Sequence, residues 1–224
     1  MILMKKNVLT LIMLLSFAIC MSQDYIDHEE KAWGYYNNEQ YELAANEFIK
    51  AMQQYDKEYG IDLEYTELCI WVAYSYLDGN NPVDAIKYYE KGINLFNEIT
   101  NGKESSYYAS ACLDLADLYH AMGDLDKAEP LYIEAMAIFK KGPETDNWKY
   151  RECLNNLAVL YKTKMQYEAA WQLFEENFKT FHKVPEESTS EYCIALLQLA
   201  EMRRIVGQYE NALHLYLDTL GNIP

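Results

Sequence analysis

The segment Arg151–Phe178 contains two stretches in which apolar residues recur every three or four positions. In the first stretch this spacing forms one apolar stripe along a helix, made of Leu154, Leu157, Ala158 and Tyr161. The polar residues Thr163–Gln166 predict a turn, and Ala170 and Phe174 then share one face of a second helix. The segment therefore predicts a helix–turn–helix hairpin in which small residues let the two backbones approach closely.

Four positions of this hairpin recur along the chain at a nearly constant interval. The alanine at the Ala170 position recurs after 41, 43, 42 and 42 residues, at Ala44, Ala85, Ala128, Ala170 and Ala212. Twelve residues earlier stand Ala32, Ala73, Ala116, Ala158 and Ala200, and nine residues earlier stand Tyr35, Tyr76, Tyr119, Tyr161 and Arg203. Four residues later stand Phe48, Tyr89, Tyr132, Phe174 and Tyr216. One such hairpin cannot bury its remaining faces, so the copies are expected to stack.

This spacing resembles the tetratricopeptide repeat family, and its long period resembles the variety found in kinesin light chains. The resemblance implies an all-α fold, a right-handed α-solenoid of about five helix–turn–helix repeats whose first helices line a concave groove. The repeats are expected at about residues 25–59, 62–98, 104–141, 147–182 and 187–220. The usual period is about 34 residues, so the additional residues are expected to lengthen helices and loops.

The two ends of the repeat array differ in polarity. Lys31 occupies a position that is apolar in the other repeats, which suits a first repeat with no neighbour before it. In the last helix, three residues are expected to pack on the partner helix: Tyr209, Ala212 and Tyr216. That arrangement leaves an apolar patch, Leu213, Leu217 and Leu220, which is expected to be covered by further sequence or by self-association.

The first 22 residues have the organisation of a secretory signal peptide. Two lysines precede an apolar run, Val8–Ile19, that is too short to span a bilayer comfortably. Small residues before Gln23 favour cleavage there, while lipidation of Cys20 and an uncleaved membrane anchor are the alternatives. Residues 23–224 are then expected to be a repeat domain exported to the periplasm or the cell exterior.

The chain is acidic, with 19 basic and 35 acidic residues and a formal net charge of −16. Removal of the leader takes away two lysines and changes this charge from −16 to −18. An acidic surface repels a phosphate backbone, so nucleic acid is not expected as a partner. Ten of the 21 tyrosines occupy packing positions of the repeats, so the aromatic excess is interpreted mainly as scaffold.

Four cysteines follow the leader, and in an exported protein an even number favours disulfides. Each lies on the first helix of a different repeat: Cys69, Cys112, Cys153 and Cys193. Neighbouring helices pack about 8 to 10 Å apart, which exceeds the limit of roughly 7 Å between bridged Cα atoms. We interpret them as buried free thiols, with one bridged pair as the alternative.

The sequence contains no recognisable catalytic motif, neither a His-Glu-x-x-His helix, a phosphate-binding glycine loop nor a Gly-x-Ser-x-Gly elbow. No enzymatic activity and no cofactor are therefore expected. Asp117 and His120 lie one helical turn apart and could supply two metal ligands, but no third ligand is evident. A solvated pair in the groove is the favoured interpretation over a metal site.

The predicted groove is lined by residues fifteen, eleven and eight positions before each repeated alanine. Within this stripe the candidate ligand-binding residues are Trp33, Tyr36, Tyr74, Asp117, His120, Asn155, Lys162, Glu201 and Arg204. The remaining positions are Glu29, Ile70, Leu77, Leu113, Val159 and Leu197. The stripe is aromatic early, acidic in the middle and basic late.

Two groove features bear on the ligand. Tetratricopeptide domains that clamp a carboxylate tail use several groove cations, whereas this stripe has only Lys162 and Arg204, so a tail clamp is disfavoured. Asn155 resembles groove asparagines that hold a peptide backbone in relatives, because an amide both donates and accepts hydrogen bonds. The alternative is that Asn155 only bonds a neighbouring helix.

Two functions remain from different classes. The first is a non-enzymatic domain outside the cytoplasm that binds a peptide or protein segment in the groove. The second is the exported sensory or regulatory part of a longer signalling protein or caspase-like protease, whose effector residues are absent from this sequence. Coding sequence beyond Pro224 would distinguish the two.

Overall fold

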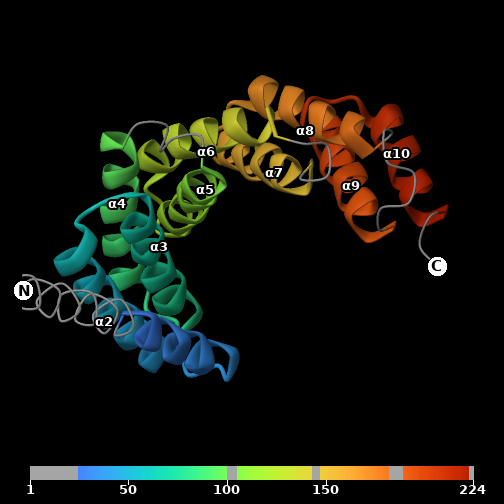
Figure 1. Ribbon diagram of the computed structural model, residues 1–224. Helices are drawn as coiled ribbons and strands as arrows, with labels where there is room; N and C mark the ends of the chain where they lie inside the picture. The colour runs from blue at the N-terminus through green and yellow to red at the C-terminus, as the bar shows by residue number, and fades with distance from the viewer. Residues whose placement is uncertain (1–24, 100–104, 143–146, 182–188, 222–224) are drawn as a thin grey trace, which may run out of the picture. The chain divides into compact units, whose positions relative to one another are not determined.

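The computed structural model describes residues 25–99, 105–142, 147–181 and 189–221 (Figure 1). The predicted leader, residues 1–22, lies outside these ranges. The described residues form helices joined by short connections and contain no strand, which confirms the all-α prediction. Residues 25–37 are helical and are followed by α2 (Tyr41–Tyr59), α3 (Leu63–Asp78), α4 (Pro82–Glu98), α5 (Ser106–Ala121), α6 (Leu125–Phe139), α7 (Asn147–Thr163), α8 (Tyr167–Phe181), α9 (Thr189–Ile205) and α10 (Tyr209–Gly221). None of these helices is long and apolar enough to cross a membrane.

Two helices, α3 and α4, begin at a residue whose side chain caps the helix. Asn81 accepts a hydrogen bond from the Asp84 backbone at 3.3 Å, and Pro82 occupies the first turn of α4. Asp62 caps α3 in the same way, accepting from the backbone N–H of Tyr65 at 3.1 Å. These caps satisfy backbone donors that the helix itself leaves unpaired.

All five hairpins turn through the same backbone geometry. The residue five positions before each repeated alanine has a positive φ of 57° to 81°: Glu39, Asn80, Gly123, Met165 and Gly207. The next backbone N–H bonds back to the carbonyl nine positions before that alanine, as from Gln166 to Tyr161 at 2.8 Å. This left-handed turn with its long backward hydrogen bond closes a helix C-terminus and reverses the chain.

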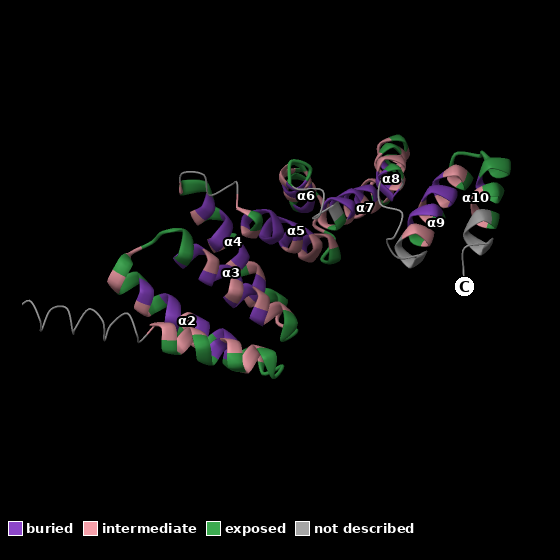
Figure 2. Ribbon diagram, turned by 45° about the vertical axis from the view of Figure 1, so that its right-hand side comes forward, coloured by how far each residue is buried: buried purple, intermediate pink, exposed green. Residues whose placement is uncertain are grey.

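The repeated alanines lie at the helix contacts, as the spacing predicts. All ten alanines of the two rows are at most 2% exposed. The chain divides into two compact units, residues 1–111 and 112–224. In the first, α3 packs on α2 and α4; in the second, α7 packs on α6 and α8, and α9 on α8 and α10. Figure 2 shows the buried residues on the helix faces turned toward their packing partners.

Arg203 fills a position that is tyrosine in the other four repeats. Its guanidinium carbon lies 3.9 Å from the centroid of the Trp171 ring. A guanidinium can stack on an aromatic face much as a ring does. The substitution therefore keeps a planar group at this position of the repeat, packed against a ring of the preceding hairpin.

The last helix differs in part from its predicted packing. Tyr209 does not pack on α9, because it is 69% exposed, and the prediction for it is wrong. Leu215 instead packs against the buried cluster of α7, α8 and α9. Leu213 and Leu217 are 58% and 54% exposed, as predicted, while the side chain of Leu220 is outside the described residues. A cover for this patch stays a prediction.

The four cysteines are free thiols, which confirms that part of their interpretation. Three of them, Cys69, Cys112 and Cys153, are buried, whereas Cys193 is only partly buried. Burial raises the pKa of the Cys69 thiol to about 11. Such a thiol stays protonated at neutral pH and acts as a small apolar group.

Candidate functional site

The aromatic groove residues of the first unit pack around a tryptophan that the sequence analysis did not select. The ring of Trp71 lies 4.4 Å from that of Trp33 and 5.3 Å from that of Tyr74, measured between centroids. Tyr36 lies 6.4 Å from Trp71. The signal for Trp71 was its spacing: it stands three residues before Tyr74 and so shares its helix face.

A cleft of about 470 Å³ adjoins this cluster. Its walls combine the rings of Trp33, Trp71 and Tyr107 with carboxylates of Glu29, Asp62, Glu64 and Glu67. Tyr hydroxyls hold two of these carboxylates, since Tyr55 donates to Asp62 at 2.9 Å and Tyr25 donates to Glu64 at 3.3 Å. Burial, and then the charge of Glu64, raise the pKa of Glu67. The cleft is acidic and aromatic.

Ile70 and Leu113 do not line a groove surface, contrary to the sequence prediction. Both are buried, at 0% and 3% exposure. Helix α4 approaches Ile70 closely at Gly92, where an added Cβ would lie 2.4 Å from Ile70 Cδ1. The close approach of the two helices encloses the isoleucine side chain.

Asp117 and His120 are not a solvated pair. The hydroxyl of Tyr132 donates to Asp117 Oδ1 at 2.5 Å, and it lies 3.3 Å from His120 Nδ1. Asn156 donates to the same carboxylate oxygen at 2.9 Å. Burial raises the pKa of Asp117, against these two hydrogen bonds, which lower it. Among the described residues no three His, Cys, Asp or Glu side chains gather as a metal site would require.

The predicted basic end of the groove is an ion pair at Arg204. Two guanidinium nitrogens of Arg204 donate to Glu201, each at 2.8 Å, and Tyr216 donates to it at 3.2 Å. The hydrogen bonds from Arg204 lower the pKa of Glu201 to about 2, and the charge of Lys162 contributes. Arg204 thus offers a ligand little net charge, while Lys162 lies partly exposed nearby on α7.

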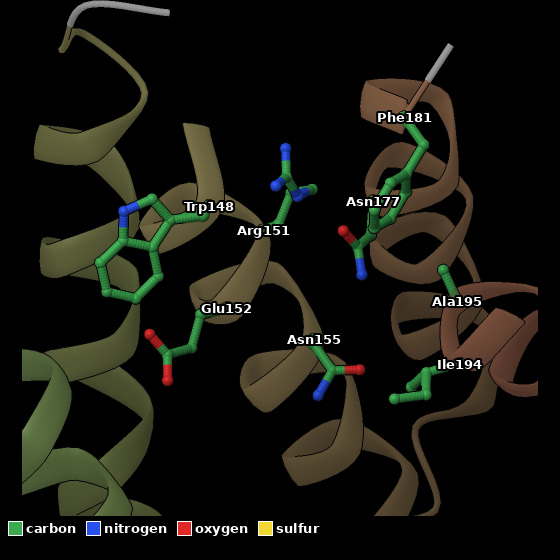
Figure 3. A pocket seen from close by; sticks show the side chains of 8 residues that line it. All are labelled: Trp148, Arg151, Glu152, Asn155, Asn177, Phe181, Ile194 and Ala195. Atoms are coloured by element: carbon green, nitrogen blue, oxygen red, sulfur yellow. The ribbon is translucent and has the colours of Figure 1, made fainter. Parts of the chain in front are cut away.

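A second cleft, of about 330 Å³, lies among α7, α8 and α9 (Figure 3). Helix α7 contributes one face of residues spaced by three and four positions: Trp148, Arg151, Glu152 and Asn155. Helix α8 contributes Asn177 and Phe181, and α9 contributes Ile194 and Ala195. Of the predicted ligand residues only Asn155 lines this cleft. The other α7 residues of the cleft could have been predicted from the sequence, because they lie three, four and seven positions before Asn155 and so share its helix face.

The polar groups of this cleft differ in their partners. The Arg151 guanidinium carbon lies 4.8 Å above the Phe181 ring, and Asn155 donates to Asn156 at 3.2 Å. Burial, and then the charge of Asp117, raise the pKa of Glu152. Asn177 is 5% exposed, and its Oδ1 accepts no hydrogen bond within the described part of the chain.

Comparison with known families identifies the class of the chain. A tetratricopeptide repeat model matches residues 66–141 and 108–181, which together are more than half of the sequence. The chain therefore belongs to the tetratricopeptide repeat family, and a kinesin-light-chain protein is among the solved structures that share its fold. A model described as anaphase-promoting complex subunit 5 matches residues 161–220. No curated protein sequence matches significantly.

Solved structures share the fold at low sequence identity. BtubC (BKLC) from P. vanneervenii is 16% identical, with a TM-score of 0.75 over 92% of this chain and 89% of its own. A putative kinesin light chain with nearly identical TPR-like repeats from Podosopora anserina is 18% identical, with a TM-score of 0.69 over 88% and 93%. The Rap conjugation gene regulator of plasmid pLS20, solved with the Phr* peptide, is 16% identical, with a TM-score of 0.53 over 88% and 53%.

Proposed function

We propose that this chain is a non-enzymatic interaction domain that binds an extended segment of a protein partner through the α7–α9 cleft and neighbouring first-helix residues. The observation that carries the proposal is the cleft itself, where one face of α7 meets α8 and α9 around a mixture of polar and apolar side chains. The family is generally a protein-interaction scaffold, and one structural neighbour is a regulator solved with a peptide.

The cleft suits a peptide better than a small charged ligand. Its volume of about 330 Å³ is at the lower end of the range for ligand pockets, roughly 300 to 1,000 Å³. Its apolar walls are combined with amide and charged groups, the combination that orients an extended chain. Lys162, two turns beyond Asn155 on α7, would meet the same segment as it leaves the cleft.

A peptide-display selection on residues 23–224 tests this function. We expect enriched peptides whose affinity falls at least about fivefold on Asn155→Ala combined with Lys162→Ala, because each lost hydrogen bond contributes about 1 kcal/mol. Gln172→Ala is the matched control, since Gln172 is exposed on α8 and bonds Glu168 of its own helix. Failure of repeated selections to enrich any peptide, or binders insensitive to the double substitution, would overturn the proposal.

We also propose that the domain acts outside the cytoplasm. The support is the order of basic, apolar and small residues in positions 1–22. Mass spectrometry of the protein from its native cells should find a mature N-terminus near Gln23, whereas a chain retaining Met1 would contradict export with cleavage.

A further inference from the structure

We infer that the α7–α9 cleft is a pocket for one uncharged, apolar side chain of the partner, whose adjoining main-chain N–H donates to Asn177. This inference rests on the proposed function and specifies which chemistry the cleft selects. Three features of the described residues support it: apolar walls, a buried acceptor without a donor, and opposite charges that offset each other.

The walls of the cleft present apolar surface that nothing in the described chain covers. Trp148 and Ile194 are 51% and 50% exposed, on α7 and α9 respectively. Phe181 and Ala195 are buried and complete the lining. Single exposed apolar residues are ordinary on a protein surface, but here two of them border the same cleft. Figure 3 shows Ile194 on the α9 side of the cleft and Trp148 on α7, with the Trp148 ring turned away from Ile194.

Asn177 supplies the polar contact. Figure 3 shows its amide extending from α8 toward the α7 side of the cleft. Its Oδ1 is enclosed and accepts no hydrogen bond from the described residues. Buried polar atoms are nearly always hydrogen-bonded in native proteins, so a lone acceptor at a cavity indicates a missing donor. A peptide N–H is such a donor, and it is fixed beside every side chain of an extended segment.

The charges at the cleft favour a neutral ligand side chain. Arg151 and Glu152 are adjacent and opposite in sign, so neither sign predominates. The Arg151 guanidinium is already stacked on Phe181 and is 5% exposed. A charged ligand group of either sign would meet one like charge and one opposite charge in this lining. Transfer of either charged group out of water carries a desolvation cost, which an uncharged side chain does not pay.

Capped amino acids are suitable probes because each carries one side chain and the flanking peptide groups. We would titrate residues 23–224 with N-acetyl-leucinamide, N-acetyl-phenylalaninamide, N-acetyl-lysinamide and N-acetyl-aspartamide, and follow backbone amide signals by NMR. The leucine and phenylalanine probes should shift signals of α7, α8 and α9 and bind at least fivefold more tightly than the two charged probes. Equal affinities for all four, or shifts located on other helices, would overturn the inference.

Two substitutions separate a ligand contact from a structural role. Asn177→Leu removes an unpaired buried acceptor while nearly conserving volume, so thermal stability should rise or hold while probe affinity falls at least fivefold. Asn211→Leu, at an exposed site on α10, is the control and should leave affinity unchanged. Loss of stability without loss of probe affinity in Asn177→Leu would show that Asn177 is structural and would overturn the inference.

Ile194→Glu provides a second test that does not depend on the stability of the core, because Ile194 is half exposed. It should abolish binding of the leucine probe. The outcomes also distinguish the inference about the apolar pocket from the proposed peptide-binding function. Selected peptides that require Asn155 and Lys162, but not Asn177 or Ile194, would refute the apolar pocket and leave the proposed function standing. A failed selection would refute the function itself.

Discussion

Tyr132 belongs to a hydrogen-bond network in which the carboxylate of Asp117 connects three helices. Tyr132 is fully buried on α6, and it donates to Asp117 on α5, which also accepts from Asn156 on α7. Burial favours the protonated carboxyl of Asp117, while the two donors favour the ionised one. The pKa of Asp117 stays above its ordinary value, so the two hydrogen bonds offset only part of the cost of burying the ionised carboxyl group.

Replacing Tyr132 with phenylalanine should destabilise the protein by about 1 to 3 kcal/mol at pH 7, because a buried carboxylate loses a donor. The loss should be smaller at pH 4. A carboxyl group whose pKa is raised by folding binds its proton more tightly in the folded state, so stability falls as pH rises from the ordinary value of 3.8 through the raised one. Removal of the donor raises the folded pKa further and enlarges this fall. Urea unfolding at the two pH values measures both effects.

Tyr161→Phe is the control for that experiment. The Tyr161 hydroxyl donates to Glu129 at 3.1 Å, and both side chains are partly exposed. Water can replace this contact, so the expected loss is below about 1 kcal/mol. If Tyr132→Phe lost the same stability at pH 4 as at pH 7, the carboxylate network would not be the source of the effect.

At the scale of single elements, the five hairpin turns adopt one geometry with different residues. Gly123 and Gly207 occupy the left-handed position, but Glu39, Asn80 and Met165 do so as well. A side chain in this conformation costs about 1 to 2 kcal/mol through contact of Cβ with the backbone. The packing of the two helices on either side outweighs that cost.

Met165→Gly should therefore stabilise the protein by about 0.5 to 1 kcal/mol, because Met165 is 74% exposed and loses little burial. The gain is less than the full strain since glycine also loses more backbone entropy on folding. Gly123→Ala is the mirror experiment and should destabilise by a similar amount, since open space around its Cβ leaves only backbone strain. Thermal unfolding measures both, and a stabilising Gly123→Ala would contradict the turn geometry.

The sequence predicts some features of these elements and not others. The alanine rows were predictable because a close helix contact requires a small side chain, and all ten are buried. The turn conformation at Glu39 and Met165 was not, because neither residue type requires a positive φ. Burial of Ile70 was not predictable from its own helix, because it depends on the close approach of α4 at Gly92. Spacing along one helix predicts a face, but what covers that face depends on its neighbours.

The candidate site illustrates the same limit. Asn155 was found because it falls on the repeated stripe of the first helices. The same stripe could not identify Asn177, since this residue lies on the second helix of its repeat. Only the structure distinguishes it, because its Oδ1 accepts no hydrogen bond from the described residues. The solvated state assigned to Asp117 failed because Tyr132, fifteen residues later in the sequence, bonds it. Hydrogen-bond partners between helices are properties of the packed structure.

At the scale of the whole molecule, the two units have separate buried clusters. One is built around Phe48 with residues of α2 and α3, and the other is built around Phe174 with residues of α7, α8 and α9. In a stacked repeat protein each hairpin contacts only its neighbours, so stability is approximately a sum of hairpin and neighbour contributions. A destabilising substitution in one unit should then leave the stability of the other unit nearly unchanged.

Phe174→Ala tests this expectation directly. Phe174 is 1% exposed, so its truncation should cost about 3 to 5 kcal/mol in the second unit. Hydrogen exchange measured by mass spectrometry should become faster in α7, α8 and α9, while α2 and α3 keep their protection because their own cluster is intact. Phe48→Ala, at a fully buried site of the first unit, should give the reverse pattern. Equal acceleration of exchange in all helices by either substitution would instead show that the two units unfold as one cooperative body.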